Sequence, residues 1–365
     1  MHSEGSGLCD DQDRAVAARL NELADDFFRA RLSGSWVPGY LEARGFGAAV
    51  QARWHIGHAP AAWVALTRHL RTLGYAEMLI EQAGLARRSP RGSLIDTFRD
   101  RVTFPVRSAD GVLAGFIGRA PKGASPGVPK YLNSPRSRLY DKSSLLFGLW
   151  EARDALTAGA CPVIVEGPLD AIAVTAAGRG RFVGVAPCGT ALTERHVTAL
   201  GQPADLRAVG VLVAFDSDAA GYGAAARAYH LLCAVTDNLA AVDLQPGQDP
   251  AQVLATEGPA ALVAMLGERA HPLADRVIDG EISRWDRWLG YAEGQINAMH
   301  AAARLIAAMP PAHVGRQVAR LAARLSLDYE LITEAVTDEV SSLWAPRAGG
   351  PPSSRPQRGR TGQPR

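Results

Sequence analysis

The sequence is poor in cysteine and contains no long apolar segment. Its 365 residues include four cysteines, no two of which form a CxxC pair, and its first residues, MHSEGSGLCDDQDR, contain no apolar signal core. The cysteine spacing excludes a zinc ribbon and a thioredoxin-type motif. No apolar run approaches the roughly 18 residues that a membrane span requires. We therefore expect a reduced, soluble, cytoplasmic protein that has no contact with a membrane and binds no zinc.

The chain also lacks a net charge that would indicate its partners. Its 39 basic and 37 acidic residues leave a formal charge of +2. The charges are unevenly placed, because residues 87–142 carry +8, residues 346–365 carry +5 and the remainder carries −11. Only three of the 39 basic residues are lysines, and all lie in the first basic block: Lys122, Lys130 and Lys142. Lysine there is either chemically required or a chance cluster on a solvated loop.

Hydrophobic periodicity divides the chain into segments of different type. Apolar residues at spacings of three and four predict helices from residue 13 to about residue 84. Two apolar runs around a turn at residues 109–111 predict a β-hairpin over residues 101–119, and the Pro- and Gly-rich residues 121–135 predict a loop. Residues 259–343 are again helical in pattern, with a break at Pro310-Pro311, and the last twenty residues predict a disordered basic tail.

Between residues 161 and 254, short apolar runs alternate with helical segments. The predicted strands are residues 162–167, 182–187, 209–218 and 239–244, each followed by a helix. This alternation is typical of a parallel sheet with helices on both faces. The predicted fold class is therefore α/β, with an α+β basic domain over residues 13–150, a parallel-sheet domain over 160–257, a helical subdomain over 258–343 and a tail over 344–365.

Acidic residues follow three of the four predicted strands. Glu166 closes the first strand and Asp170 lies one helical turn further on; Asp216 and Asp218 close the third strand, and Asp249 lies in the loop after the fourth. Ligands bind at the carboxyl ends of the strands in an open parallel sheet. Clustered carboxylates without His or Cys nearby favour Mg²⁺ or Mn²⁺, and such a site suits phosphoryl or nucleotidyl transfer. Each acid taken alone is more simply a solvated loop residue or a helix cap.

Several strings resemble a known family. The segments EGPLDAIA from Glu166 and FDSDAAGYGAA from Phe215 resemble the Toprim domain, the metal-binding module of bacterial primases, topoisomerases and some nucleases. Upstream, FRDRVTFPVRSADGVLAGFIGRA and PKYLNSPRSRLYDKSSLLFGLWEAR are similar to the RNA-polymerase core of DnaG-type bacterial primases. The similarity runs from about residue 13 to residue 336, nearly nine tenths of the chain. The resemblance implies a Toprim parallel sheet preceded by the basic domain.

The resemblance also implies roles for particular residues. Matched by position, the residues that would bind Mg²⁺ or Mn²⁺ are Glu166, Asp216, Asp218 and Asp249, with Asp170 in support, and Glu166, Asp216 and Asp218 would be catalytic. The basic residues that would face nucleotide phosphates or nucleic acid are Arg44, Arg119, Lys130 and Lys142. Tyr131 is the aromatic residue expected to stack on a base, whereas Lys122 matches no family position and is expected to be solvated.

The sequence departs from the family pattern in three respects. We expect neither the zinc-binding domain with which DnaG-type primases begin nor the helicase-binding domain with which they end. The family usually has a second Asp after Asp249-Pro250, where this chain has Ala251, so one outer carboxylate of the metal site is missing. A replicative helicase or a separate zinc-domain protein is therefore an expected partner.

Together these features predict a primase. The predicted enzyme is a DNA-directed RNA polymerase that makes short RNA primers from ribonucleoside triphosphates on single-stranded DNA by metal-dependent nucleotidyl transfer. A Toprim-type nuclease is one alternative, against which the primase-like segment from residue 99 to residue 142 argues. A non-catalytic nucleic-acid-binding replication adaptor is the other, and Ala251 leaves it open.

Overall fold

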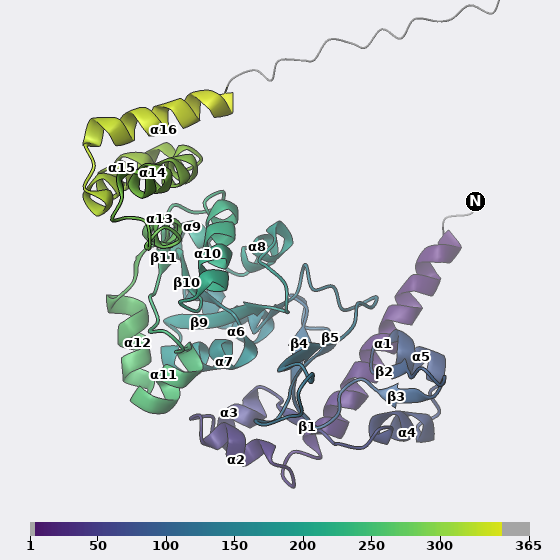
Figure 1. Cartoon of the computed structure of the whole chain (residues 1–365). Coiled ribbons are helices and arrows are strands. Elements are labelled where there is room, and N and C mark those ends of the chain that lie inside the picture. The colour runs from purple at the N-terminus through teal and green to yellow at the C-terminus, as the bar shows by residue number, and fades with distance from the viewer. Residues whose placement is uncertain (1–3, 345–365) are drawn as a thin grey trace, which may run out of the picture. The chain divides into compact units, whose positions relative to one another are not determined.

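The computed structural model describes residues 4–344, and side chains over residues 12–343 (Figure 1). The chain divides into two units, Met1–Arg284 and Trp285–Arg365. Apart from residue 344, the predicted basic tail lies outside the described residues, and the domain boundaries drawn from the sequence stay predictions. Within the described residues, the helices are all too short or too polar to cross a membrane.

The N-terminal part of the first unit combines helices with antiparallel strands. Its helices are α1 (Glu4–Arg29), α2 (Val37–Glu42), α3 (Ala48–Arg53), α4 (Ala65–Thr72) and α5 (Glu77–Gln82). One sheet has the order β1-β4-β5-β6 and consists of β1 (Gly57–Ala59), β4 (Arg101–Arg107), β5 (Leu113–Arg119) and β6 (Tyr131–Asn133). A separate pair is formed by β2 (Ala86–Arg88) and β3 (Leu94–Asp96). The predicted hairpin over residues 101–119 is confirmed as β4 and β5.

Two predictions for this part were wrong in detail. Strand β1 interrupts the stretch expected to be helical, and β6 lies within the stretch expected to be a loop. Both strands have three residues and pair with the outer edges of the hairpin. A three-residue strand is too short to show the alternation of apolar and polar residues from which strands are predicted.

The second part of the first unit is built on a six-stranded sheet of order β12-β11-β10-β8-β9-β7. Its central strands, β8 (Cys161–Val165), β9 (Phe182–Pro187), β10 (Val211–Ala214) and β11 (Leu239–Ala241), are parallel. The edge strands β7 (Leu146–Phe147) and β12 (His271–Pro272) are antiparallel to their neighbours and were not predicted. The third and fourth strands end earlier than expected, so Asp216 and Asp218 follow β10 rather than lie within it.

Helices cover both faces of this sheet, as predicted. Figure 1 shows α7 (Pro168–Gly178), α11 (Pro250–Glu257) and α12 (Pro259–Glu268) on one face, and α8 (Glu194–Leu200), α10 (Ala219–Leu232) and α13 (Leu273–Ser283) on the other. The remaining helices are α6 (Leu149–Thr157) and α9 (Leu206–Val209). Parallel strands buried on both faces read as continuous apolar runs, which is why this region was predictable.

One hydrophobic core joins the two parts of the first unit. It contains Phe104 of β4 and Ile117 of β5 together with Val163 of β8 and Ile172 of α7. Phe147 of β7 lies at the junction, where its ring contacts those of Phe104 and Trp54. Because this core is continuous, the basic hairpin is held in a fixed position beside the parallel sheet.

The described part of the second unit contains three helices, α14 (Ala292–Ala307), α15 (Pro311–Leu325) and α16 (Tyr329–Trp344). Pro311 is the first residue of α15, where its missing N–H and fixed φ are tolerated. The predicted break between two helices at Pro310-Pro311 is therefore confirmed.

Candidate active site

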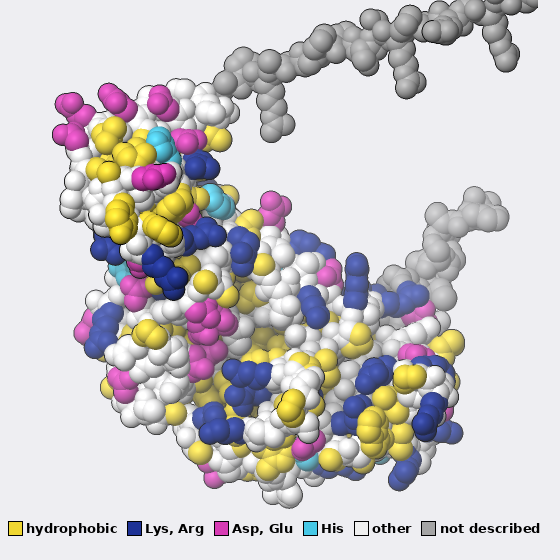
Figure 2. Space-filling view, viewed as in Figure 1, with side chains coloured by type: hydrophobic (Ala, Val, Ile, Leu, Met, Phe, Trp, Pro, Cys, Tyr) yellow, Lys and Arg dark blue, Asp and Glu magenta, His cyan; other side chains and the backbone are white. Residues whose placement is uncertain are grey.

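A cavity of about 520 Å³ lies at the carboxyl edge of the parallel sheet and faces strands β5 and β6. Eight of the ten residues singled out from the sequence line it: Arg44, Arg119, Lys130, Tyr131, Glu166, Asp170, Asp216 and Asp249. In Figure 2, acidic and basic side chains gather as adjacent patches near the middle of the face shown. The cavity thus combines basic residues of the N-terminal part with carboxylates of the parallel sheet.

Local structure explains where each carboxylate lies. Glu166 follows β8, and its Oε1 accepts a hydrogen bond of 2.9 Å from the Asp216 N–H, which ties together the ends of two neighbouring strands. Asp170 lies in the first turn of α7 and is buried; its Oδ1 accepts a hydrogen bond of 3.2 Å from the Ala251 N–H. Ala251, which stands where the resemblance leads one to expect a second Asp, therefore contributes its backbone N–H as a donor.

Two of the acids are helix caps. Asp218 is the N-cap of α10 and accepts a 2.8 Å hydrogen bond from the Gly221 N–H. Asp249 is the N-cap of α11 and accepts a 2.7 Å hydrogen bond from the Gln252 N–H. Both residues are therefore helix caps, the simpler interpretation of an isolated acid. Each cap uses only one carboxylate oxygen and leaves the other available.

The carboxylates are close enough to oppose one another's ionisation. Burial raises the pKa of Glu166, and the nearby Asp216 and Asp218 raise it further. Burial also raises the pKa of Asp216, with the charges of Asp249 and Asp218 acting in the same direction and Lys130 and Arg276 opposing. The pKa of Asp170 is raised by its burial first and by Asp249 second. A cation in the cavity would relieve this repulsion.

The donor set fits a hard divalent cation. The described residues that line the cavity include carboxylates and neither His nor Cys, which matches the oxygen ligands of Mg²⁺ and Mn²⁺ rather than zinc. Among the residues that the structure describes, no three acidic, His or Cys side chains already converge as a metal cluster. The carboxylates at the loops and caps would therefore have to adjust to share an ion.

The basic side of the cavity is interleaved with tyrosine rings. The guanidinium carbons of Arg44 and Arg119 lie 4.0 and 4.8 Å from the ring centre of Tyr40, and the Lys130 ammonium lies 5.6 Å from that of Tyr131. Cation–π contact of this kind stabilises neighbouring positive charges. The Nε of Arg119 is buried and has no hydrogen-bond partner among the described residues, so this donor is available to an anion. Burial raises the pKa of Tyr131 to about 12.

Two predicted residues do not line the cavity. Asp218 lies just outside it as the α10 cap, although its charge acts on Glu166 and Asp216. Lys142 lies on the segment after β6, where its carbonyl oxygen is 2.8 Å from a ring nitrogen of His196. The roles given to these two residues stay predictions.

The sequence did not reveal Arg276, which supports the Asp216 loop. This arginine of α13 has a side chain only 1% exposed. Its Nη2 donates hydrogen bonds of 3.1 and 2.9 Å to the carbonyl oxygens of Phe215 and Asp216, and its Nη1 lies 2.5 Å from Asp243 Oδ1. A single Arg in a helical pattern normally indicates an exposed residue, so no signal in the sequence identified this one.

Comparison with known proteins assigns both parts of the first unit. The family described as DNA primase catalytic core, N-terminal domain, matches residues 27–153, and the Toprim-like family matches residues 163–254. The DNA primase of Deinococcus radiodurans is 37% identical over 237 residues, which are 64% of this chain and 40% of that protein. The DNA primase of Streptomyces coelicolor is 33% identical over 332 residues, 89% of this chain and 50% of that protein. The chain thus spans about half the length of the curated relatives it matches.

Solved structures give a fuller match. The RNA polymerase domain of Mycobacterium tuberculosis primase DnaG, in complex with double-stranded DNA, is 30% identical with a TM-score of 0.72, and the match covers 86% of this chain and 99% of that one. A DNA primase domain from Pseudomonas aeruginosa is 30% identical with a TM-score of 0.70, covering 88% and 99%. A DnaG primase catalytic domain bound to single-stranded DNA is 29% identical with a TM-score of 0.69, covering 86% and 99%.

Proposed function

The chain belongs to the DnaG-type primase family, whose catalytic core it matches, and we propose that it synthesises short RNA primers on single-stranded DNA by metal-dependent nucleotidyl transfer. The observation that carries this proposal is the cavity in which Arg44, Arg119 and Lys130 face Glu166, Asp216 and Asp249. Nucleotidyl transfer needs both kinds of group, because a triphosphate must be bound and charge on the leaving pyrophosphate must be stabilised.

The residues of the cavity divide this work. Arg44, Arg119 and Lys130 would bind the phosphates of the incoming ribonucleoside triphosphate, with the free Nε of Arg119 as one donor. Tyr131 would present its ring to a base. Mg²⁺ or Mn²⁺ held by Glu166, Asp216, Asp218 and Asp249 would supply a Lewis acid for the attacking 3′-hydroxyl and the pyrophosphate. Asp170, buried behind them with a raised pKa, would hold the α11 N-terminus in place through Ala251.

The template and the partners are proposed from the family. Single-stranded DNA would be held through its phosphates by the basic residues beside the cavity, so its binding should weaken with salt. A replicative helicase or a separate zinc-domain protein would act with this chain at initiation, in the cytoplasm. Addition of either partner should raise the rate of initiation more than the rate of extension.

The proposal is tested by replacing Asp216 and Asp218 with Asn. The double variant should keep the fold, because Asn can still cap α10, and should lose primer synthesis on single-stranded DNA with either Mg²⁺ or Mn²⁺. Synthesis is measured by extension with labelled ribonucleotides, and folding by circular dichroism. Continued extension by the folded double variant would show that this site assignment is wrong.

A second assay separates the alternative activities. Labelled DNA incubated with Mn²⁺ but without nucleotides stays intact if the enzyme is a primase and is cut if it is a Toprim-type nuclease. An adaptor without catalytic activity would give neither product while still binding DNA.

A further inference from the structure

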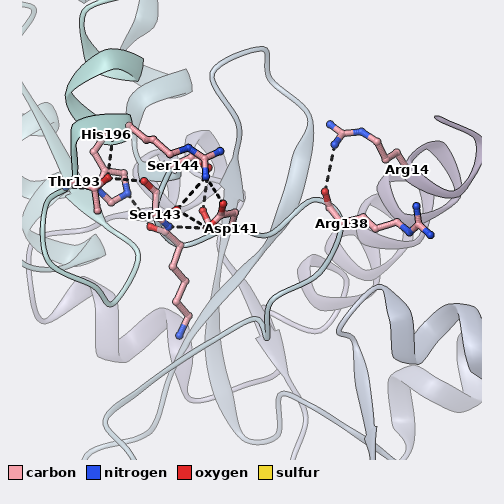
Figure 3. A network of polar contacts seen from close by, with 9 residues as sticks. Arg14, Arg138, Asp141, Ser143, Ser144, Thr193 and His196 are labelled. Carbon is pink, nitrogen blue, oxygen red and sulfur yellow. Dashed lines mark hydrogen bonds and ion pairs between the residues drawn. The ribbon is translucent and has the colours of Figure 1, made fainter. Parts of the chain in front are cut away.

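A second cavity, of about 820 Å³, is lined by five arginines. They come from α1, α6, α8 and the segment after β6: Arg14, Arg136, Arg138, Arg153 and Arg195. Among the described residues, the acids that line the same cavity are Asp110 and Asp141, so the described lining carries a net charge of +3. Figure 3 shows Arg14 and Arg138 on one side of this region and Asp141, Ser143 and Ser144 on the other.

This cavity is separate from the candidate active site. The two cavities share no lining residue. Arg119, at the end of β5, lines the first cavity, whereas Ser108 and Asp110, in the turn between β4 and β5, line the second. Each strand of this hairpin has seven residues, so the two cavities lie roughly 20 Å apart along it, at about 3.4 Å per residue.

Three of the five arginines have no carboxylate partner among the described residues. Arg195 lies 2.6 Å from Asp141, and Arg138 lies 3.2 Å from Asp13. By contrast, Arg14 donates only to the Arg138 carbonyl oxygen, at 3.3 Å, and Arg153 only lies near the Trp150 ring. Arg136 is exposed. Unpaired guanidinium groups around one cavity repel each other until an anion binds between them.

The wall of the cavity that carries Asp141 is held rigidly. Asp141 Oδ1 accepts hydrogen bonds from the N–H and hydroxyl of Ser143, and these together with Arg195 lower its pKa to about 2. The Thr193 hydroxyl donates a 2.6 Å hydrogen bond to the Ser143 carbonyl oxygen, and His196 closes a capping box with Thr193 (Figure 3). Arg195 thus lies at a capped helix start, beside a carboxylate whose pKa is lowered.

We propose that this cavity binds backbone phosphates of a nucleic-acid strand, at a distance from the stretch held at the candidate active site. Guanidinium and serine hydroxyl groups are the side chains that contact phosphate without reading sequence. No aromatic side chain is among the described residues that line the cavity, so this lining offers no platform for a base and suits a backbone better than a free nucleotide. This inference about the second cavity depends on the proposed function in one respect, that the ligand is a nucleic acid.

The test compares two double variants of the full chain that remove the same charge. Arg136→Gln with Arg153→Gln removes two cavity residues that take part in no ion pair among the described residues, so no acid is left unpaired. Arg179→Gln with Arg227→Gln is the matched control, since both residues are exposed and line neither cavity. Melting temperatures establish that both variants fold.

Binding of a labelled single strand of about 20 nucleotides is measured over a range of salt concentrations without nucleotides or metal. The cavity variant should bind roughly tenfold more weakly than the control, and its plot of log affinity against log salt should be shallower by about 1.4, since each phosphate contact to a single strand contributes about 0.7. Equal affinities and slopes for the two variants would overturn the proposal.

Two further arms identify the ligand and separate the two proposals. Binding of inorganic triphosphate is measured for each variant. If the loss of Arg136 and Arg153 weakens triphosphate binding but leaves strand binding unchanged, the ligand is not a nucleic-acid strand. The Asp216→Asn, Asp218→Asn double variant should bind the strand with the unaltered salt slope. Primer synthesis by that variant therefore tests the proposed function, and its strand binding tests the second cavity independently.

Discussion

Arg276 illustrates how one buried side chain can support a loop of the candidate active site. Its guanidinium group contacts the carbonyl oxygens of Phe215 and Asp216 and the carboxylate of Asp243, and it lies near the Tyr222 ring. It therefore joins the loop after β10 to α13 and to the end of β11. Its positive charge also opposes the rise in the pKa of Asp216. We regard Arg276 as a positioning residue for the carboxylates.

Replacing Arg276 with Met should damage both stability and synthesis. Met leaves the buried carbonyl oxygen of Phe215 and the partly buried one of Asp216 without this donor, and the expected loss is about 2–4 kcal/mol of unfolding free energy. The displaced Asp216 loop should raise the Mn²⁺ concentration that gives half-maximal synthesis. Arg276→Lys, which keeps the charge, should recover part of that metal response. If Arg276→Met lowers only the melting temperature and leaves the metal requirement unchanged, the arginine is merely structural.

The pair of His271 and Asp243 makes stability depend on pH. The two side chains lie 2.9 Å apart, and contact with Asp243 raises the pKa of His271 while contact with His271 lowers that of Asp243. The His contribution is complete below its unfolded pKa and is lost as pH rises through the folded pKa; the Asp contribution is lost as pH falls through its lowered pKa. The pair therefore stabilises most between the ordinary pKa values of 3.8 and 6.5.

The measurement is the unfolding free energy of His271→Gln and of the unaltered chain by urea titration. Because Asp243 is 63% exposed, the difference should be at most about 1 kcal/mol near pH 5.5 and smaller near pH 8.5. A difference that grew toward alkaline pH would contradict the assignment.

Two glycines of α10 show how an element constrains the site. A side-chain carbon at Gly221 would overlap the backbone carbonyl of Asp216, whereas at Gly223 it would meet only the flexible end of Arg227, at 3.4 Å. The first turn of α10 therefore packs directly on the loop that carries Asp216. Only glycine at position 221 allows this approach.

Gly221→Ala should lose about 1–3 kcal/mol of unfolding free energy and most primer synthesis, because the Asp216 loop must move. Gly223→Ala is the matched control on the same helix. It should be neutral or up to about 1 kcal/mol more stable, since alanine favours helix over glycine. Thermal unfolding and primer extension measure the two effects, and similar results for both variants would disprove the close contact at Gly221.

The elements differ in how far the sequence could predict them. Strand β9 was predicted at its observed bounds because FVGVAP is a continuous apolar run. Strand β10 ends at Ala214, four residues early, because the chain leaves the sheet and bends at residues 217–218 before α10 begins at Ala219. The short edge strands β1, β6, β7 and β12 depend on pairing with distant strands. Arg276 could not be identified for the same reason, since its contact with Asp216 spans 60 residues.

At the scale of the molecule, the near-neutral total charge conceals a separation of charge. The basic block from residue 87 to residue 142 supplies Arg119 and Lys130 to the candidate active site, and the parallel sheet supplies the carboxylates. The same block supplies Arg136 and Arg138 to the second cavity. Motifs in the sequence predicted the residues that line the first cavity. The sequence did not show which of them lie close together, because this depends on the core shared by the two sheets.

This separation leaves the acids of the sheet in need of a cation, and metal binding should therefore stabilise the whole first unit. A ligand that binds only the folded state, at about one hundred times its dissociation constant, adds about 2.7 kcal/mol. For a unit of 284 residues that corresponds to a rise in melting temperature of roughly 4–5 °C. Mn²⁺ or Mg²⁺ should produce this rise in the unaltered chain, measured by calorimetry without DNA or nucleotides.

Two variants show whether the rise comes from the predicted carboxylates. Asp216→Asn with Asp218→Asn removes two charges, so its melting temperature without metal should not fall and the rise with Mn²⁺ should disappear. Ala251→Asp places a further carboxylate on the lining of the cavity, beside the buried Asp170, so it should be less stable without metal and should gain more from Mn²⁺ than the unaltered chain. If Mn²⁺ still raises the melting temperature of the double Asn variant, the cation binds elsewhere, because this variant differs from the unaltered chain only at Asp216 and Asp218.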